Sequence, residues 1–187
     1  VVAVLDTGSP PVNSDAWAAT NFISGGVNFV NGNFDPTDPD ADALYFDSNG
    51  RLVRSHGTHV SSTIGAKNDG NDINGFGVKV LPIKVIETGN YSSSLNTVIN
   101  GIKYASGDSN SSGEVAPSSE GSVKVINMSL GFPGWWSGGC PTGLQSAIDY
   151  AVSQGITVVA AAGNSGLEIP GGTNYPAGCN NVISVAN

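Results

Sequence analysis

Long apolar runs divide the chain, and each run ends abruptly in small or polar residues. The runs span residues 1–5, 78–86, 123–131 and 156–162, and another begins at residue 181. Continuous apolar runs that are rich in Val and Ile are typical of strands buried on both faces of a parallel sheet. The second run is predicted to form one or two strands, broken at Pro82.

The segments between these runs carry apolar residues at helical spacing. One predicted helix has its apolar face on Leu95, Val98, Ile99, Ile102 and Ala105. A second helix, which Gly155 should end, has its apolar face on Leu144, Ala147, Ile148, Ala151 and Val152. Alternating strands and helices predict an α/β fold, a three-layer sandwich around a mostly parallel sheet.

Composition fits one globular domain and argues against two classes of partner. Of the 187 residues, 39% are hydrophobic and only 12% are charged, against a usual charged share of ~25%. The net charge is −8 and no basic stripe is present, which argues against a nucleic-acid partner. No apolar run approaches the ~20 residues of a membrane span. The chain starts with Val1 and carries no visible signal peptide, which fits a mature, processed or truncated chain.

The two cysteines, Cys140 and Cys179, are predicted to form a disulfide. Each lies among turn residues, in Gly-Gly-Cys-Pro and Ala-Gly-Cys-Asn. Two thiols without a CxxC pair make a poor zinc site. A disulfide implies an oxidising compartment. Its contribution to stability would be up to ~4 kcal/mol in the chain-entropy model, less any strain.

Both histidines of the chain lie in the segment Ser55-His56-Gly57-Thr58-His59. Ser55 is a suitable N-cap, so a helix of small residues is predicted to begin at His56. Two interpretations are open: a pair of helical histidines with local hydrogen bonds, or a catalytic histidine at a helix start. A zinc site of the HExxH type is disfavoured by the spacing and by the missing Glu.

An aspartate follows the first apolar run, in Leu5-Asp6-Thr7-Gly8. If the run is a strand of a parallel sheet, Asp6 lies at its carboxyl end. Binding and catalytic sites of open α/β sheets form at that edge. Asp6 is therefore either a functional acid or a residue that caps the turn after the strand.

Two polar segments offer the oxygen ligands that suit calcium. Residues 33–42 contain four aspartates and two prolines, and form either a calcium loop or a solvated acidic loop. Residues 67–75 are a tight loop rich in Asn and Asp, for which calcium is again one interpretation. Trp135 and Trp136, in a glycine-rich loop, are either a surface cluster or part of a substrate wall.

Four motifs, in order along the chain, resemble those of the subtilisin-like serine proteases, or subtilases. Residues 2–8 resemble the aspartate motif, and residues 55–60 resemble the histidine motif, whose first histidine is catalytic. Residues 127–131 resemble the strand beside the S1 pocket, and residues 161–164 resemble the oxyanion-hole motif. The resemblance implies a subtilisin-like fold and hydrolysis of peptide bonds in proteins or peptides by an Asp-His-Ser triad.

The resemblance also implies roles for particular residues. His56 would move the proton of the nucleophile, Asp6 would orient the imidazole, and Asn164 would donate to the oxyanion. Residues that would pair with the substrate or line S1 are Gly89, Asn90, Tyr91, Ser129, Leu130, Gly131, Ala161 and Gly163. A structural calcium ion would be bound by Asp15, Asn68, Asp69, Asn71 and Asn74.

The nucleophile that the resemblance implies is missing from the 187 residues. The family's Gly-Thr-Ser-Met-Ala motif does not occur, and the segment usual before the aspartate strand is absent. Residues 1–187 are therefore expected to be a partial catalytic domain of a secreted endopeptidase, inactive alone. The rest of the domain would then be its partner, over a sheet face left exposed. The alternatives are a nucleophile-less peptide-binding fragment or pseudoprotease, and a non-protease α/β enzyme.

Overall fold

A computed structural model gives the arrangement of most of the chain. It describes residues 1–12, 15–38, 45–46, 52–53, 55–68, 75–88, 92–132, 139–164 and 174–186. Of residues 15–16, 45–46 and 52–53 it describes the backbone alone. All statements below concern these residues.

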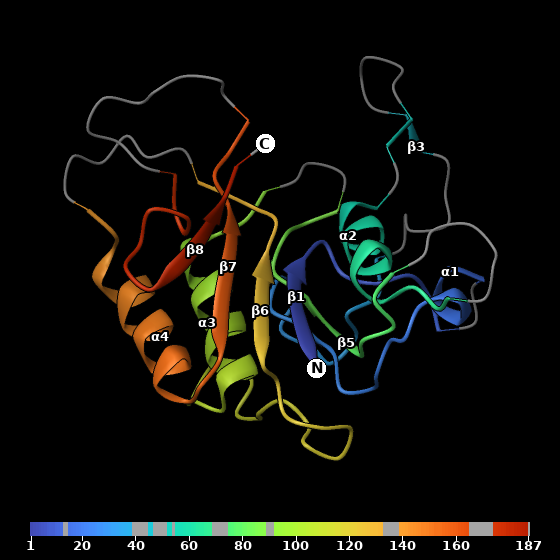
Figure 1. Ribbon diagram of the computed structural model, residues 1–187, viewed down its shortest axis with the longest axis horizontal. Helices are drawn as coiled ribbons and strands as arrows, with labels where there is room; N and C mark the ends of the chain where they lie inside the picture. Colours follow the sequence, from blue (N-terminus) through green and yellow to red (C-terminus); the bar gives the residue numbers. More distant parts are fainter. Residues whose placement is uncertain are drawn as a thin grey trace.

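Six parallel strands form the central sheet, in the order β2-β5-β1-β6-β7-β8 (Figure 1). Their bounds are β1 Val2–Asp6, β2 Val27–Asn28, β5 Val80–Lys84, β6 Val125–Met128, β7 Thr157–Ala161 and β8 Val182–Val185. Outside this sheet lie helix α1, Asp15–Ala19, and an antiparallel pair of strands, β3 Tyr45–Phe46 and β4 Leu52–Val53. The parallel sheet and its helices confirm the predicted α/β fold.

The predicted break at Pro82 is wrong, because β5 continues through it as one strand paired with β1. The Val80 N–H donates to Asn21 O, and Lys84 O accepts from Phe29 N–H. Residues two apart face the same edge of a strand, so Pro82 also faces this edge. Its partner strand β2 begins only at Val27, and the missing N–H of Pro82 therefore breaks no ladder bond.

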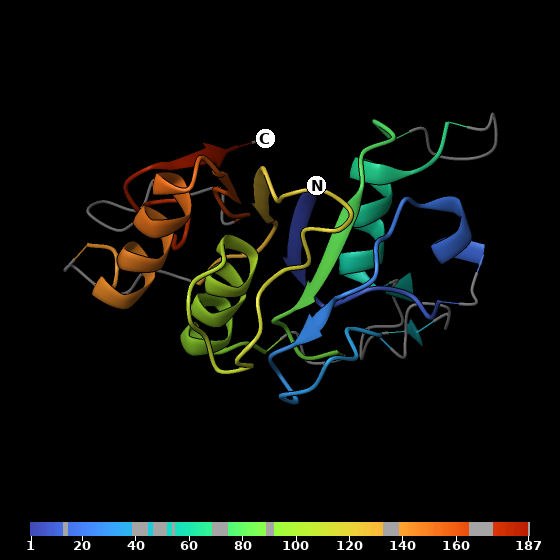
Figure 2. The same cartoon turned by 90° about the horizontal axis from the view of Figure 1, so that it is seen from below.

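Helices cover the two faces of the sheet unequally (Figure 2). Helix α2, His56–Gly65, lies over β1 and β5 on one face. Helices α3, Leu95–Ser106, and α4, Thr142–Ser153, pack against each other on the opposite face. None of the helices in the described parts of the chain has the length and apolar character to cross a membrane.

The main core lies between the sheet and the helices α3 and α4. Helix α3 begins at a capping box on Ser94, which satisfies free N–H groups at its first turn. A Cβ on Gly101 would lie 2.8 Å from Val85 Cγ1, so this glycine lets α3 approach the strands closely. The fully buried side chains of this core include Leu5, Ile102, Ile126, Met128, Leu144 and Ile148.

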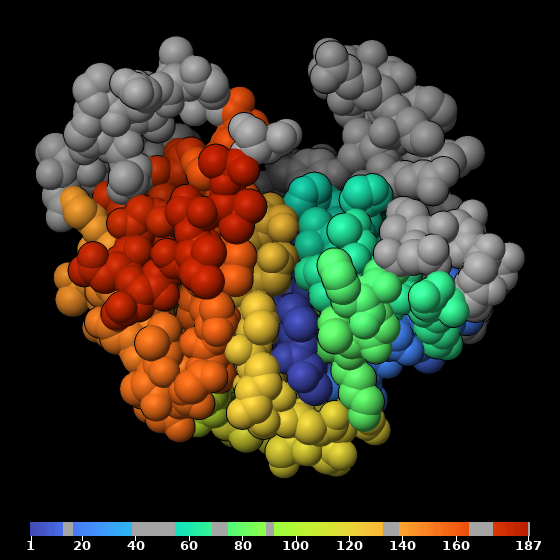
Figure 3. All heavy atoms as spheres, viewed as in Figure 1, coloured from blue at the N-terminus to red at the C-terminus, as the bar shows by residue number. Residues whose placement is uncertain are grey.

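The face of the sheet that carries α2 is open beside that helix. Figure 3 shows atoms of β1 and β6 between α2 and the strands β7 and β8. On the edge strand β8, Ile183 and Val185 are 55% and 53% exposed. Exposed apolar side chains on a sheet edge and face are typical of surfaces that another segment covers.

Candidate active site

The Asp6 carboxylate and the His56 imidazole lie side by side at the carboxyl end of β1. His56 Nδ1 lies 2.8 Å from Asp6 Oδ1 and 2.9 Å from Oδ2. The Asp6 side chain is fully buried, whereas 45% of the His56 side chain is exposed. When Nδ1 of the neutral ring donates to the carboxylate, Nε2 is left as the proton acceptor. The pair therefore has the geometry of a general base and the acid that orients it.

The start of α2 holds His56 in place. Ser55 is the N-cap of this helix, and its Oγ accepts from Thr58 N–H at 3.4 Å. His56 is the first helical residue, so the cap that satisfies the free N–H groups of the first turn also fixes the histidine backbone.

A glycine contact joins α2 to the turn after β1. A Cβ on Gly57 would overlap the carbonyl oxygen of Gly8, so the two backbones meet only because Gly57 has no side chain. The Gly57 N–H also donates to Thr7 Oγ1 at 2.9 Å. Because Thr7 follows Asp6 and Gly57 follows His56, these contacts hold the two candidate catalytic residues together.

The environment changes the proton affinity of His56. The hydrogen bond to Asp6 raises the pKa of His56 above its ordinary value of 6.5, partial burial of the ring opposes this rise, and the negative charge of Asp6 adds to it. The site thus stabilises the imidazolium, the state that a histidine base reaches when it has accepted a proton.

Other predicted site residues lie at the same edge of the sheet. Residues 129–131 directly follow β6, which lies between β1 and β7. Ala161 ends β7, and Gly163 and the exposed Asn164 follow it. The carboxyl ends of parallel strands share one edge, so residues 129–131 lie between Asp6 and the segment 161–164. Gly89, Asn90, Tyr91, Trp135 and Trp136 lie outside the described residues.

A short segment links the loops that follow β6 and β7. Asn174 Nδ2 donates to Ala162 O at 2.7 Å. Phe132 and Tyr175 exchange two backbone hydrogen bonds, with N···O distances of 2.7 and 3.2 Å. Asn174 was not predicted from the sequence, because no motif marks a residue whose side chain braces a neighbouring loop.

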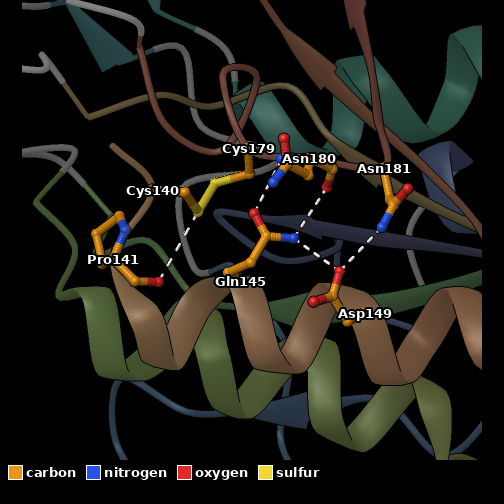
Figure 4. Close-up of a disulfide and its surroundings, with 7 residues drawn as sticks. All are labelled: Cys140, Pro141, Gln145, Asp149, Cys179, Asn180 and Asn181. Carbon is orange, nitrogen blue, oxygen red and sulfur yellow. Dashed lines mark hydrogen bonds between the residues drawn. A yellow bond between two sulfur atoms is a disulfide. The ribbon is translucent and has the colours of Figure 1, made fainter. Parts of the chain in front are cut away.

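The Cys140–Cys179 disulfide anchors the loop that carries this segment (Figure 4). The two Cα atoms are 5.0 Å apart, and the two cysteines are 39 positions apart in sequence. Beside the disulfide, Gln145 of α4 accepts from Asn180 N–H at 2.9 Å and donates to Asn180 O at 3.1 Å. The start of α4 is therefore tied to the loop before β8 by a covalent bond and by two hydrogen bonds.

The predicted calcium ligands are only partly within the described residues. Asn68 is exposed, just beyond the end of α2. The side chain of Asp15 and the residues Asp69, Asn71 and Asn74 lie outside the description. No group of three or more His, Cys, Asp or Glu residues that could hold a metal occurs in the described parts of the chain.

Of the two aspartates of the acidic loop that the structure describes, Asp35 and Asp38, the second is buried. Asp38 is 1% exposed, and its two carboxylate oxygens accept from Ser55 Oγ at 2.6 Å and from Thr88 Oγ1 at 2.9 Å. Asp35 of the same loop is exposed and binds Thr37 N–H at 3.0 Å. The solvated-loop interpretation is therefore wrong for Asp38, because its carboxylate is buried against the N-cap of α2. No sequence signal pairs residues 38 and 55.

The chain belongs to the subtilase family, whose family model matches residues 1–187. An extracellular protease of Xanthomonas campestris pv. campestris is 37% identical over 100% of this chain and 32% of its own length. Subtilisin DY of Bacillus licheniformis is 34% identical, over 98% of this chain and 54% of its own length. The major intracellular serine protease of Bacillus subtilis is 37% identical, over 100% of this chain and 50% of its own length.

The fold is similar to that of solved protease structures. A structure of a protease from Pseudoalteromonas arctica matches with a TM-score of 0.73 and 34% identity, over 98% of this chain and 54% of that one. The chain thus spans between about a third and about half of the length of the proteins it matches.

Proposed function

We propose that these residues belong to a secreted serine endopeptidase that hydrolyses peptide bonds through an Asp-His-Ser triad. The observation that carries the proposal is the contact of His56 Nδ1 with the buried Asp6 carboxylate, at 2.8 Å. His56 would take the proton of the attacking serine and later give it to the leaving amine. Asp6 would hold the ring in the required tautomer and stabilise the imidazolium.

Residues at the neighbouring strand ends would supply the other parts of the site. The Asn164 side-chain amide would donate to the oxyanion, a role worth about 10²–10³ in kcat in subtilisin itself. Residues 129–131 and 89–91 would pair with the backbone of an extended protein or peptide substrate. Ala161 and Gly163 would line S1. The order of β1, β6 and β7 in the sheet supports this arrangement.

The nucleophilic serine would come from outside residues 1–187, which form part of a catalytic domain and are inactive alone. Two observations support this inference: no Gly-Thr-Ser-Met-Ala motif occurs in the sequence, and the matched relatives are longer than the chain. The remaining part of the domain would be the partner that covers the open sheet face around Ile183 and Val185.

Fluorophosphonate labelling tests this function, because the probe reacts covalently with an activated serine. The natural full-length protein and residues 1–187 alone would be treated with the probe, digested and mapped by mass spectrometry. We expect stoichiometric labelling of one serine outside residues 1–187 and none within them. A stoichiometric label inside the 187 residues would overturn the assignment. Peptide binding without any label in the full-length protein would favour the pseudoprotease.

A structural calcium ion would be bound by Asp15, Asn68, Asp69, Asn71 and Asn74. Carboxylate and amide oxygens suit calcium, and Lys67 N–H, which donates to Ala19 O at 2.8 Å, brings the end of α2 beside α1. Calcium at about 100 times its Kd should stabilise the fold by about 2.7 kcal/mol. Thermal unfolding with calcium and with a chelator measures this. Asp15→Asn should weaken the effect, and a wild-type Tm that is indifferent to calcium would contradict the site.

Secretion is supported by the disulfide rather than by the relatives. Those relatives include both an extracellular and an intracellular protease. A Cys140–Cys179 bond persists in an oxidising compartment and is rare in the cytosol. We therefore place the protein outside the cytosol.

A further inference from the structure

A chain of buried and half-buried polar side chains contacts the segments that carry Asp6 and His56. Its two charged members, Lys84 and Asp38, are 3% and 1% exposed. Lys84 Nζ donates to Thr88 Oγ1 at 2.6 Å, and Thr88 Oγ1 donates to Asp38 Oδ1 at 2.9 Å. The hydroxyl of Ser55 donates to the other oxygen, Oδ2, at 2.6 Å.

The Asp38 carboxylate determines the direction of the hydrogen bonds around Ser55. An ionised carboxylate can only accept, so the single hydroxyl proton of Ser55 is committed to Asp38. The Ser55 oxygen is then left as an acceptor. It accepts from the N–H of Thr58 at 3.4 Å and from the Thr58 hydroxyl at 3.0 Å. Asp38 thus holds the N-cap of α2 in its capping orientation.

The Ser55–Asp38 hydrogen bond also determines the direction of the hydrogen bonds between the start of α2 and the residue after β1. Thr7 Oγ1 lies 3.3 Å from Ser55 Oγ. Because the Ser55 proton is committed to Asp38, Thr7 can only be the donor in this contact, and it shares the two lone pairs of Ser55 Oγ with the two donors of Thr58. The oxygen of Thr7 remains free to accept the Gly57 N–H, which lies 2.9 Å away. Thr7 directly follows Asp6, whereas Ser55 and Gly57 directly precede and follow His56. These hydrogen bonds therefore hold the backbone beside Asp6 against the backbone beside His56.

Asp38 is itself held against the segment that follows β1. The Asp38 N–H donates to Ser9 O at 2.7 Å, and the Ser9 N–H donates to Pro36 O at 3.0 Å. The carboxylate is therefore attached by backbone pairing to the same turn that carries Thr7 and Gly8. This arrangement makes Asp38 a fixed support for α2.

We propose that Asp38 is a positioning residue for His56, and that it acts through Ser55 by fixing the first turn of α2 against the end of β1. It touches neither a substrate nor the reacting atoms. The proposal rests on the proposed function only in regarding the Asp6–His56 pair as catalytic. The contact geometry that it explains exists whether or not the protein hydrolyses peptides.

A rival account is that Asp38 acts on His56 only through its charge. Three charged groups are relevant: Asp6, which contacts the ring, and the buried pair of Asp38 and Lys84. Lys84 is joined to Asp38 through Thr88, and its amine also donates to Thr7 O. The charge that raises the pKa of His56 is that of Asp6, and neither Asp38 nor Lys84 is among the causes of the shift. Ser55 carries no charge, so substituting it separates the positioning effect from the charge effect.

A double-mutant cycle on the pKa of His56 tests the proposal. The pKa would be measured by NMR titration of the His56 ring in the natural full-length protein, in wild type, Asp38→Ala, Ser55→Ala and the double variant. Each single substitution should lower the pKa by about 0.5 unit or more, about threefold in proton affinity, because a looser Asp6 contact raises it less. If Asp38 acts through Ser55, the double variant should fall no further than the lower single variant.

Two control variants accompany the cycle. Asp35→Ala removes the same charge from an exposed position of the same loop, and should leave the pKa of His56 unchanged. Ser55→Thr keeps the hydroxyl and should preserve the wild-type pKa. If Asp38→Ala does not fold, Asp38→Asn, which retains the shape, replaces it in the cycle.

An unchanged pKa in Ser55→Ala, or additive effects of the two substitutions, would overturn the positioning role. None of these readouts requires hydrolysis. A failure of this proposal is therefore distinguishable from a failure of the proposed function, which fluorophosphonate labelling tests.

Discussion

At the scale of single residues, the protonation of His56 should make the stability of the fold depend on pH. The pKa of His56 is raised above 6.5 by its hydrogen bond to Asp6. The folded state therefore holds this proton more tightly than the unfolded chain does. The resulting stabilisation is fully present below about pH 6.5 and is lost as the pH rises through the folded-state pKa.

The prediction that follows compares wild type with His56→Gln, which cannot carry the charge. The Tm difference between the two proteins should be larger at about pH 5.5 than at about pH 9. Thermal unfolding followed by circular dichroism at both pH values measures it. A difference that is equal at the two pH values, or larger at the higher one, would contradict the assigned direction of the pKa shift.

Sequence motifs could locate Asp6 and His56, but not the residues that support them. Asp6 lies at the end of a recognisable strand, and His56 lies in a recognisable histidine motif. Asp38 lies in a segment of acids and prolines that is typical of an exposed loop. It is buried and accepts a hydrogen bond from Ser55, which is 17 positions away in sequence. Such a contact follows from the fold rather than from any local pattern.

At the scale of elements, the approach of α2 to the turn after β1 depends on a glycine. Gly57→Ala places a methyl group on the Gly8 carbonyl and should destabilise the fold by about 1–3 kcal/mol. Gly143, near the start of α4, provides the control. A Cβ there would have Ile99 Cδ1 as its nearest neighbour, at 3.4 Å, which is an ordinary contact. Gly143→Ala should therefore be neutral or slightly stabilising. Urea unfolding measures both. Equal effects would show that the close contact is unimportant.

The disulfide provides a second prediction at this scale. The 39-residue separation of Cys140 and Cys179 corresponds to up to ~4 kcal/mol of stabilisation in the chain-entropy model. Replacing both cysteines by Ser should lower the urea midpoint accordingly. Reduction of the wild type should give the same midpoint as the double variant. A double variant as stable as the oxidised wild type would show that the hydrogen bonds of Gln145 alone hold the loop.

The pattern of apolar residues predicted which strands and helices form, but it did not predict whether a strand continues through a proline. The apolar runs and helical spacings predicted β1, β6, β7, α3 and α4 because each is buried in a regular way. The break expected at Pro82 does not occur. Whether a proline interrupts a sheet depends on which edge its nitrogen faces, and that depends on where the neighbouring strand begins.

At the scale of the whole molecule, the distribution of helices leaves the sheet unequally covered. In the described parts of the chain, helices α3 and α4 cover one face, while α2 lies over β1 and β5 on the other. The α/β class could be predicted from the order of strands and helices. The strand order β2-β5-β1-β6-β7-β8 could not, because parallel strands connected by long crossovers can pair in many orders.

The central claim is that His56 is the general base of a peptidase, and one comparison of two histidine variants tests it most directly. The natural full-length protein would be assayed for kcat/KM on a peptide substrate as wild type, His56→Ala and His59→Ala. His59 is an exposed residue of the same helix, so His59→Ala is the matched control. We predict a loss of at least about 10⁴-fold in His56→Ala and no more than a few-fold change in His59→Ala. Activity retained in His56→Ala, or lost equally in both variants, would contradict the account.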